Sequence, residues 1–367
     1  MVGRPGRAIG RGRSVVLGIT IAAAVLGVVE LTLRLAGFRY DPPDPIVSNI
    51  VHGMRGLHRF HPAWFWELRP GAQVENCPGE WINRAGFRGP DRPLTRAPGT
   101  LRIVTLGDSS TFGTRMCRHR AYPDVLEREI PGAEVLNFGV IGFTAFQGAK
   151  LLAGKAIDYH PDLVIAAFGS INEARPALGD DVDAKFALTS RVPASVALWR
   201  ERLHPLRLFQ AVERVGAAFG TDPTDPAEIA RRRLDAMDAI QGNADYAPNQ
   251  SLASFERSLE SIVSTARTHG ARVAFVIPPS RQETDRNIPL IAEYAATTRR
   301  VAARLGVPCW DVHRAFRALR DSDRTLLLDG VHPNVEGHRV YGKFLGQYVR
   351  QLVAADAASA ARMDAAH

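Results

Sequence analysis

Residues 101–113 read LRIVTLGDSSTFG and join a short apolar run to a tight turn and the start of a helix. The run 101–106 has the length and composition of a buried strand. Gly107 and Asp108 permit a sharp turn at its end, which presents Ser109 on an exposed corner with its backbone N–H near the helix start. Ser109 is therefore a candidate nucleophile. Gly-Asp-Ser also occurs by chance in many turns, so the assignment depends on the ends of the other strands.

The apolar runs that follow predict an α/β fold. Further buried strands are expected at 134–138, 163–168, 272–277 and 307–312. Apolar residues at helical spacing lie between them, as in 252–266 and 291–305. Strands that alternate with helices form a parallel sheet, and right-handed crossovers place helices on both of its faces. We therefore expect a three-layer α/β/α sandwich with a central parallel sheet and with the functional loops at the carboxyl ends of the strands.

Length and composition are those of a folded domain with an appendage. The chain has 367 residues, of which 46% are apolar and 23% charged, and these values exclude a disordered chain, a collagen and a polytopic membrane protein. The formal net charge is +8, but four arginines lie in the first thirteen residues, so the remainder is only mildly basic. No concentrated basic face interleaved with aromatic residues follows, and we expect no nucleic-acid partner.

The stretch 14–29 is uncharged and is the most apolar part of the chain. Arg13 and Arg34 flank it and can snorkel to the interfaces, which lengthens it toward a full membrane span. Cleavage at 22–24 would leave an apolar new terminus. We therefore expect a transmembrane anchor over 14–36 in preference to a removed signal peptide.

The positive-inside rule orients this anchor, and the other segments follow in order. The basic segment 1–13 stays in the cytoplasm, and everything after the span lies outside, in the periplasm or the extracellular space. Residues 37–98 are rich in Pro, Gly and Arg and predict a linker and an irregular extension. The α/β domain covers 99–352, with an insertion at 174–250 that suggests a lid, a partner surface or a packed helical hairpin. The Ala-rich residues 353–367 predict a flexible tail.

The insertion contains Trp199 together with Arg200, Arg202 and Arg207. These side chains could contact a glycan or the membrane surface, or they could pack against the core. The sequence leaves these interpretations open.

Three cysteines occur in the part of the chain placed in an oxidising compartment, where one disulfide and one buried thiol are expected. Three pairings of Cys77, Cys117 and Cys309 are possible. Cys309 lies in an apolar run and is expected in the core, so the preferred pair is Cys77 with Cys117. Their spacing does not resemble a zinc site, and we expect no metal.

Polar residues follow the other predicted strands at the same edge of the sheet. The second strand ends at Gly139, which could aim an unobstructed N–H inward, and the third is followed by Asn172, which supplies a side-chain amide donor. Near the C-terminus, Asp329 and His332 are spaced by three on a loop. The carboxylate can hold the imidazole in one tautomer and stabilise its protonated form. With Ser109, these residues supply a nucleophile, a base, its orienting carboxylate and donors for a developing oxyanion.

These four blocks, in this order, resemble the SGNH hydrolase superfamily, also called the GDSL family, over about residues 99–352. The apolar N-terminus and the segment 83–90 look like the membrane-anchored bacterial members. The resemblance implies a flavodoxin-like sandwich that needs no cofactor. It implies a catalytic triad of Ser109, Asp329 and His332. It implies an oxyanion hole formed by Ser109, Gly139 and Asn172.

The third block departs from the family pattern of Gly-x-Asn-Asp, because Ser170 stands in place of Gly and Glu173 in place of Asp. Ser170 narrows the space beside the donor, Asn172. Glu173 is interpreted as a substrate contact or as the carboxylate at a helix N-terminus. Asp108 is interpreted as a turn former that bonds nearby N–H groups. His338 is expected on the solvent side of the final helix, as a surface residue.

The sequence thus predicts a single-span serine esterase whose catalytic domain faces outward. The expected substrate is an O-acyl group, O-acetyl above all, on an envelope or extracellular polysaccharide, or a small ester. Three alternatives stay open: an O-acyltransferase acting on the same substrates, a lipid esterase whose lid is the insertion, and a non-catalytic glycan-binding component of the envelope. The complete triad argues against the last of these.

Overall fold

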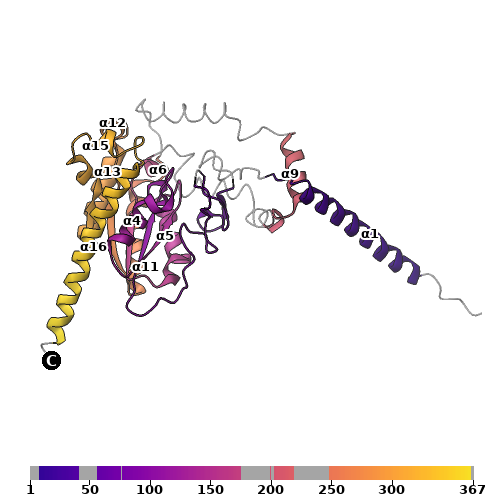
Figure 1. The fold of residues 1–367 in the computed structure, drawn as a ribbon, viewed down its shortest axis with the longest axis horizontal. Helices are drawn as coiled ribbons and strands as arrows, with labels where there is room; N and C mark the ends of the chain where they lie inside the picture. Colours follow the sequence, from indigo (N-terminus) through magenta and orange to yellow (C-terminus); the bar gives the residue numbers. More distant parts are fainter. Residues whose placement is uncertain are drawn as a thin grey trace, which may run out of the picture.

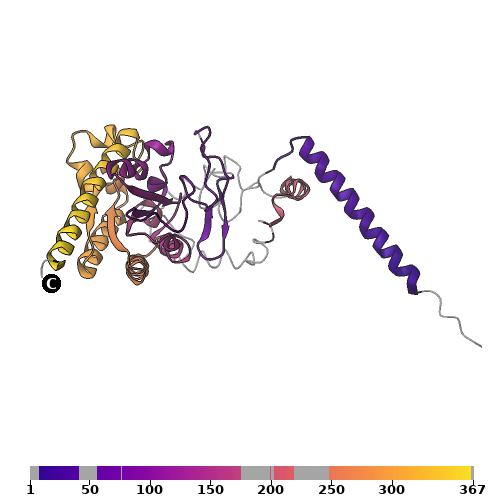
Figure 2. The ribbon, with the colours of Figure 1, turned by 60° about the horizontal axis from the view of Figure 1, so that its bottom comes forward.

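The computed structural model describes residues 8–40, 56–75, 77–174, 199, 202–218 and 248–364. A long N-terminal helix, α1, stands away from an α/β body that contains the central sheet (Figure 1). The sheet has five strands, all parallel, in the order β4-β3-β5-β6-β7. Helices lie on both of its faces, as Figure 2 shows from another side.

The elements of the body have the following bounds. The strands are β3 (Leu101–Gly107), β4 (Ala133–Gly139), β5 (Leu163–Ala167), β6 (Arg272–Ile277) and β7 (Cys309–Asp311). The longer helices are α4 (Tyr122–Glu129), α5 (Ala145–Gly154), α11 (Leu252–Thr268), α13 (Leu290–Leu305) and α16 (Val335–Asp364). Shorter helices are α3 (Ser109–Phe112), α6 (Ile171–Ala174), α12 (Gln282–Asn287), α14 (Val312–Arg317) and α15 (Ser322–Thr325). Two 3-10 turns are η1 (Arg118–Arg120) and η2 (Ala156–Tyr159).

Two apolar cores form because side chains of each strand alternate between the faces of the sheet. Ile103 and Ile165 belong to the core beneath α4 and α16. Val104 and Leu106 belong to the core beneath α5, α11 and α13. The three-layer sandwich predicted from the alternation of strands and helices is therefore confirmed.

The five predicted strands are present, and the last one is shorter than expected. It begins at Cys309 and ends at Asp311, where 307–312 was predicted. The Asp311 carboxylate accepts a hydrogen bond from the Arg314 N–H at 2.8 Å and so caps α14. A helix start at Val312 removes the end of the apolar run from the strand.

The strand order places β3 beside both β4 and β5. The chain adds β4 on one side of β3 and then continues with β5 on the other side. Open α/β sheets bind ligands beyond the carboxyl ends of their strands at such a switch point. Gly107, the last residue of β3, pairs with Gly139 of β4 and Ala167 of β5. The loops after these three strands therefore start at the same level.

The segment 56–98 is more ordered than the predicted irregular extension. β1 (His58–His61) and β2 (Phe65–Leu68) form an antiparallel hairpin. Phe65 and Trp66 are buried, and the Trp66 indole N–H donates to the Ile141 carbonyl at 3.1 Å. The Pro and Gly content of the segment predicted loops, but its aromatic side chains make it part of the core.

The helix α1 (Ala8–Leu35) contains a candidate membrane span, Arg13–Leu35, of 23 residues with a mean hydropathy of 2.3. None of this span is buried inside the protein, and it matches the predicted anchor in extent. Its carboxyl-terminal end contacts α9 (Arg207–Ala218), which belongs to the insertion. Arg200 and most of the insertion lie outside the described residues.

The described residues of the predicted C-terminal tail belong to α16. α16 continues to Asp364, where a tail from residue 353 was expected, because an Ala-rich sequence has a high intrinsic helix propensity.

The disulfide between Cys77 and Cys117 is present, with their Cα atoms 5.3 Å apart, so this pairing is confirmed. Cys309 is free and half-buried at the start of β7.

Candidate active site

The turn after β3 positions Ser109 as the first residue of α3. Asp108 precedes it as the N-cap, and its Oδ1 accepts a hydrogen bond from the Ser110 N–H at 2.8 Å. This agrees with the predicted turn-forming role of Asp108. Gly107 is needed for close packing, since a Cβ there would lie 2.0 Å from Thr111 Oγ1. Gly113 ends the helix with φ at +83°, a conformation that favours glycine.

His332 lies between Ser109 and Asp329. Ser109 Oγ is 2.8 Å from His332 Nε2, and His332 Nδ1 is 2.9 Å from both carboxylate oxygens of Asp329. A carboxylate accepts only, so Nδ1 carries the ring proton and Nε2 is free to accept the serine hydroxyl proton. The side chains of Ser109, His332 and Asp329, predicted as a triad, therefore form one continuous chain of hydrogen bonds in that order.

The surroundings of Asp329 keep it ionised. Its Oδ1 accepts hydrogen bonds from the N–H groups of Val331 at 3.1 Å and His332 at 3.0 Å, and Arg115 Nη1 lies 3.3 Å from Oδ2. Burial by itself would raise the pKa of Asp329, but the hydrogen bonds from the side chain and backbone of His332 outweigh it and hold this pKa well below its ordinary value. The Asp329 carboxylate is therefore charged at neutral pH.

The loop that carries Asp329 and His332 is fastened on two sides. Ser110 Oγ donates to the Val331 carbonyl at 3.2 Å, which ties the loop to α3. On the opposite side, the Arg281 N–H donates to the Gly330 carbonyl at 2.8 Å. A Cβ at Gly330 would lie 2.5 Å from Thr284 Oγ1, so the loop is pressed against α12. These contacts hold His332 in place relative to Ser109.

Asn172 and Gly139 differ in how they could serve a developing oxyanion. Asn172 Nδ2 donates to Asp108 Oδ2 at 3.0 Å, which leaves the second hydrogen of this amide for another acceptor. The Gly139 N–H donates to Asn137 Oδ1 at 3.0 Å, so it is engaged inside β4. Gly139 instead allows close packing, because a Cβ there would lie 2.3 Å from the Phe112 nitrogen. Three residues later, Gly142 has φ at +79°, and its N–H forms no hydrogen bond within the described residues.

Glu173 is buried, and its carboxylate binds N–H groups at the starts of two helices, α6 and α5. Its Oε2 accepts the Ser170 N–H at 2.9 Å, and its Oε1 accepts the Ala145 N–H at 3.1 Å at the start of α5. Burial raises the pKa of Glu173 to about 7; the Ser170 N–H opposes the rise and the charge of Asp108 adds to it. The long side chain of glutamate thus joins the Asn172 loop to α5.

His338 is buried, contrary to the prediction of a surface residue. It shares one face of α16 with Tyr341, Leu345 and Val349, and this face packs against the body. His338 Nδ1 accepts a hydrogen bond from the Tyr122 N–H at 3.2 Å. Burial lowers the pKa of His338 to about 3, so the ring is neutral. Its spacing of three from Tyr341 was the signal for the buried face.

Comparison with known proteins shows the family to which the chain belongs. A model of the GDSL-like lipase/acylhydrolase family matches residues 105–340, which is more than half of the chain. No curated protein matches. Among solved structures, the chain is similar to the lipase/acylhydrolase from Enterococcus faecalis, with 18% identity and a TM-score of 0.44, over 68% of this chain and 95% of that one.

Two further structures show the same level of similarity. A member of the lipolytic protein G-D-S-L family from Veillonella parvula has 13% identity and a TM-score of 0.41, over 66% of this chain and 94% of that one. A catalytic mutant of an acetylxylan esterase from Geobacillus stearothermophilus has 15% identity and a TM-score of 0.42, over 68% of this chain and 94% of that one. On the family match, the chain belongs to the GDSL-like lipase/acylhydrolase family and is an ester-bond hydrolase.

Proposed function

We propose that the protein is a serine esterase that works through an acyl-enzyme, with Ser109 as nucleophile, His332 as base and Asp329 as its orienting carboxylate. The observation that carries this proposal is the continuous hydrogen-bonded chain from Ser109 Oγ through His332 to Asp329. As Oγ attacks the ester carbonyl, its proton passes to His332 Nε2. The protonated imidazole then gives that proton to the leaving alcohol, and water releases the acyl group by the same steps in reverse.

Three donors would stabilise the oxyanion. The Ser109 N–H lies at the start of α3, and Asn172 keeps one amide hydrogen beyond its bond to Asp108. We assign the third donor to Gly142 in place of Gly139, because the Gly139 N–H already donates to Asn137 Oδ1. Donors held in place before reaction stabilise the charge that develops in the transition state.

The proposed location is the outer face of a membrane, with α1 as an uncleaved anchor. Leu208 N–H donates to Glu30 Oε2 at 2.8 Å, and Arg34 Nη2 donates to the Pro205 carbonyl at 3.0 Å. The end of α1 thus packs with the insertion, as expected if it stays attached to the folded chain. The arginines before the span favour a cytoplasmic N-terminus.

The proposed substrate is a small O-acyl group, such as O-acetyl, on an envelope or extracellular polysaccharide. Ser109 is buried, but the side chains of His332 and Asp329 are 21% and 37% exposed, so the site opens to solvent on the side of the base. Arg115 adds an exposed polar side chain beside Asp329. Polar surroundings of this kind suit a sugar better than an acyl chain that must be removed from water.

The test is labelling of the full chain in membranes with a fluorophosphonate probe, beside Ser109→Ala. Labelling of the wild-type protein and its loss in the variant support the serine mechanism; equal labelling of both removes Ser109 from it. Acetate release from an O-acetylated polysaccharide is then compared with fatty-acid release from a phospholipid vesicle. Release from the vesicle alone would make the protein a lipid esterase.

A further inference from the structure

A buried arginine from the segment 56–98 holds the end of the short helix that begins with Ser109. The Arg88 side chain is fully buried, and its Nη1 donates to the carbonyls of Phe112 at 2.7 Å and Gly113 at 2.8 Å. Its Nη2 donates to the Met116 carbonyl at 2.5 Å. The guanidinium carbon also lies 4.6 Å from the centre of the Phe112 ring. One side chain thus satisfies three buried carbonyls in the chain that follows Ser109.

The helix α3 needs such support because it has four residues. Its own backbone bonds run from Phe112 N–H to the Asp108 carbonyl and from Gly113 N–H to the Ser109 carbonyl. The last carbonyls of any helix lack partners within it, and leaving them buried and unpaired costs free energy. Arg88 supplies these partners. The position of Ser109 therefore depends on a residue that precedes 105–340, the part matched by the family model.

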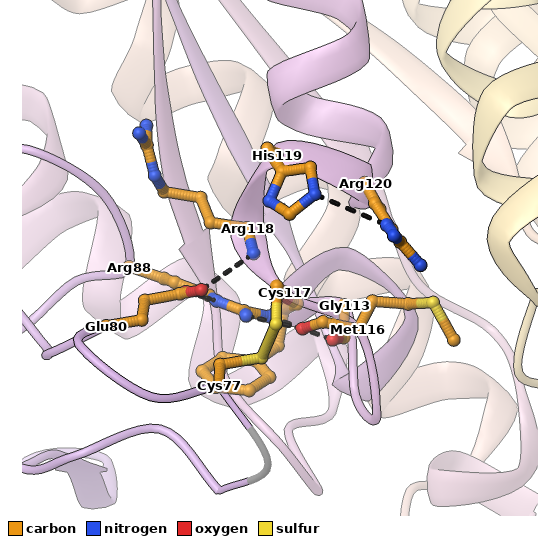
Figure 3. Close-up of a disulfide and its surroundings, with 10 residues drawn as sticks. Cys77, Glu80, Arg88, Gly113, Met116, Cys117, Arg118, His119 and Arg120 are labelled. Atoms are coloured by element: carbon orange, nitrogen blue, oxygen red, sulfur yellow. Dashed lines mark hydrogen bonds and ion pairs between the residues drawn. A yellow bond between two sulfur atoms is a disulfide. The ribbon is translucent and has the colours of Figure 1, made fainter.

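Glu80 and Cys77, both in the segment 56–98, hold the loop that follows α3 (Figure 3). Glu80 Oε1 accepts from Arg88 Nε at 2.6 Å, and its Oε2 accepts from the Arg118 N–H at 2.8 Å. Next to it, Cys77 is bonded to Cys117. The Glu80 carboxylate therefore orients the Arg88 guanidinium and also binds the loop at Arg118.

We propose that Arg88 is a positioning residue for catalysis, with Glu80 as its orienting partner. It touches no reacting atom; it sets the end of α3 and the loop that carries Arg115, whose Nη1 lies 3.3 Å from Asp329 Oδ2. A shift of this loop would move Ser109 relative to His332. Displacements of about 1 Å at a reacting group can cost about 10²-fold in rate. This inference rests on the proposed role of Ser109.

The test compares Arg88→Lys with Arg102→Lys, a matched control. Arg102 is also fully buried and also binds a glutamate, Glu134, and backbone carbonyls, but it lies near the amino end of β3, away from Ser109. A lysine has three donors on one nitrogen and cannot reproduce the planar fork of arginine at either site. Both variants should therefore lower the melting temperature to a similar degree.

Only Arg88→Lys should slow the reaction of Ser109. We expect its kcat and its rate of phosphonylation by a fluorophosphonate to fall about 10- to 100-fold per folded molecule, with KM within about twofold and the pH midpoint unchanged. Unchanged phosphonylation in Arg88→Lys, or an equal fall in Arg102→Lys, would overturn the inference. If wild-type protein is not labelled at all, the proposed function fails instead.

If Arg88→Lys does not fold, Glu80→Gln tests the positioning role of Arg88 in its place. The amide keeps one acceptor oxygen but loses the charge that orients the guanidinium. Phosphonylation should fall in the same direction and by less, about 3- to 10-fold. A rate equal to that of the wild type would overturn the inference in that case.

A second inference concerns α9, which crosses the carboxyl-terminal end of α1. Leu208 at its start bonds Glu30 of α1, and the Tyr40 N–H donates to Gln210 Oε1 at 3.0 Å. In Figure 2, α9 is seen along its axis while α1 lies across the view, so the two helices cross steeply. A helix in this position lies flat where α1 would leave the membrane.

The exposed side chains of this region are apolar and basic. Val212 and Val215, one helical turn apart, are 62% and 60% exposed, and Trp199 is 59% exposed. The Arg202 guanidinium lies 5.6 Å from the centre of the Trp199 ring. The earlier alternative that Trp199 packs in the core is therefore wrong. Apolar and tryptophan side chains with arginines beside them are typical of helices that lie in a membrane interface.

We infer that α9 lies in the headgroup region of the membrane that α1 spans, with its exposed valines toward the acyl chains and the neighbouring Arg202 near lipid phosphates. This rests on the proposed anchor. The contacts to Glu30 and Tyr40 place α9 at the end of the span, which is the depth where amphipathic helices bind. The lipid surface would then help to set how the catalytic site faces outward.

The test uses the full chain in vesicles of phosphatidylcholine and phosphatidylglycerol, with the free Cys309 replaced by Ser. A fluorophore sensitive to polarity is attached to Val212→Cys, to Leu26→Cys in α1, or to Leu319→Cys, an exposed control on the body. Lipids with brominated acyl chains should quench the first two labels and leave the third unchanged.

Each pattern of quenching has one meaning. Quenching at residue 26 without quenching at residue 212 would overturn the inference while keeping the anchor. No quenching at residue 26 or residue 212 would contradict the proposed membrane anchor as well. A label at residue 212 that is buried but indifferent to brominated lipid would assign the surface to a second copy of the chain or another protein, and this also overturns the inference.

Discussion

Replacement of Asp329 by Asn changes the hydrogen bond to the base and leaves the size of the side chain the same. An asparagine oxygen can still accept from the N–H groups of Val331 and His332, which lie 3.1 Å and 3.0 Å from Oδ1. Its Nδ2 is a donor, however, and in the place of Oδ2 it would lie 2.9 Å from His332 Nδ1, where it opposes a proton on that nitrogen. The imidazole then carries its proton on Nε2. That nitrogen lies 2.8 Å from Ser109 Oγ and could no longer accept the hydroxyl proton.

The size of the effect follows from this loss of the productive tautomer. In a triad whose carboxylate is buried, the wrong tautomer costs about 10⁴-fold in kcat. The side chain of Asp329 is 37% exposed, and solvent weakens such an interaction. We therefore expect a fall of about 10³-fold in kcat, which corresponds to about 4 kcal/mol of transition-state stabilisation.

The assay is hydrolysis of a short-chain aryl ester from about pH 5 to pH 9, with thermal unfolding as a control for the fold. The low pKa of Asp329 keeps its carboxylate ionised over this range, so a rise of activity with pH would not come from Asp329. In Asp329→Asn the plateau should fall and the midpoint should move to lower pH, because the imidazolium loses its anionic partner. An unchanged plateau and midpoint, with activity abolished in His332→Ala, would show that Ser109 and His332 work as a dyad.

Four further outcomes are expected. Ser109→Ala should lower kcat by about 10³-fold or more at an unchanged melting temperature, and a loss below about tenfold in ester hydrolysis would contradict it. Asn172→Ala should cost about 10² to 10³ in kcat with little change in KM; a change confined to KM would make Asn172 a substrate contact. Replacing Cys77 and Cys117 with Ser opens a loop with a sequence separation of 40 and should lower the free energy of unfolding by about 4 kcal/mol in denaturant titrations, whereas no loss would contradict the covalent tie. The pKa of His338 is lowered to about 3, so the unfolded chain binds its proton first, and stability should fall as pH drops below about 6.5, by up to about 1.4 kcal/mol per pH unit. His338→Gln should reduce that slope, and an equal slope in both proteins would contradict it.

The sequence determined those features that depend on neighbours along the chain. Apolar runs with turns at their ends identified the five strands, and their alternation with helices predicted the layers. The nucleophile turn and the Asp329-x-x-His332 loop are also local, because one short segment contains all the residues that shape each of them. Parallel strands end at one edge of a sheet, so local motifs at strand ends could be brought together before any contact was known.

Features that depend on what faces a residue across space were decided only by the tertiary structure. The spacing of His338 from Tyr341 indicates the apolar face of α16, but the partner that makes a buried imidazole tolerable there, the Tyr122 N–H, is brought to it only by the fold.

Arg88 illustrates the physical reason most clearly. In the sequence it is one arginine in a segment rich in Pro, Gly and Arg, with the composition of a solvent-exposed linker. Its burial is stable because Glu80 and three carbonyls from beyond Ser109 surround the guanidinium, and these partners lie 8 to 28 residues away along the chain. A buried charge is tolerated only where such partners converge. Composition and periodicity carry no information about that convergence, so the link between the extension and the nucleophile exists only in the folded protein.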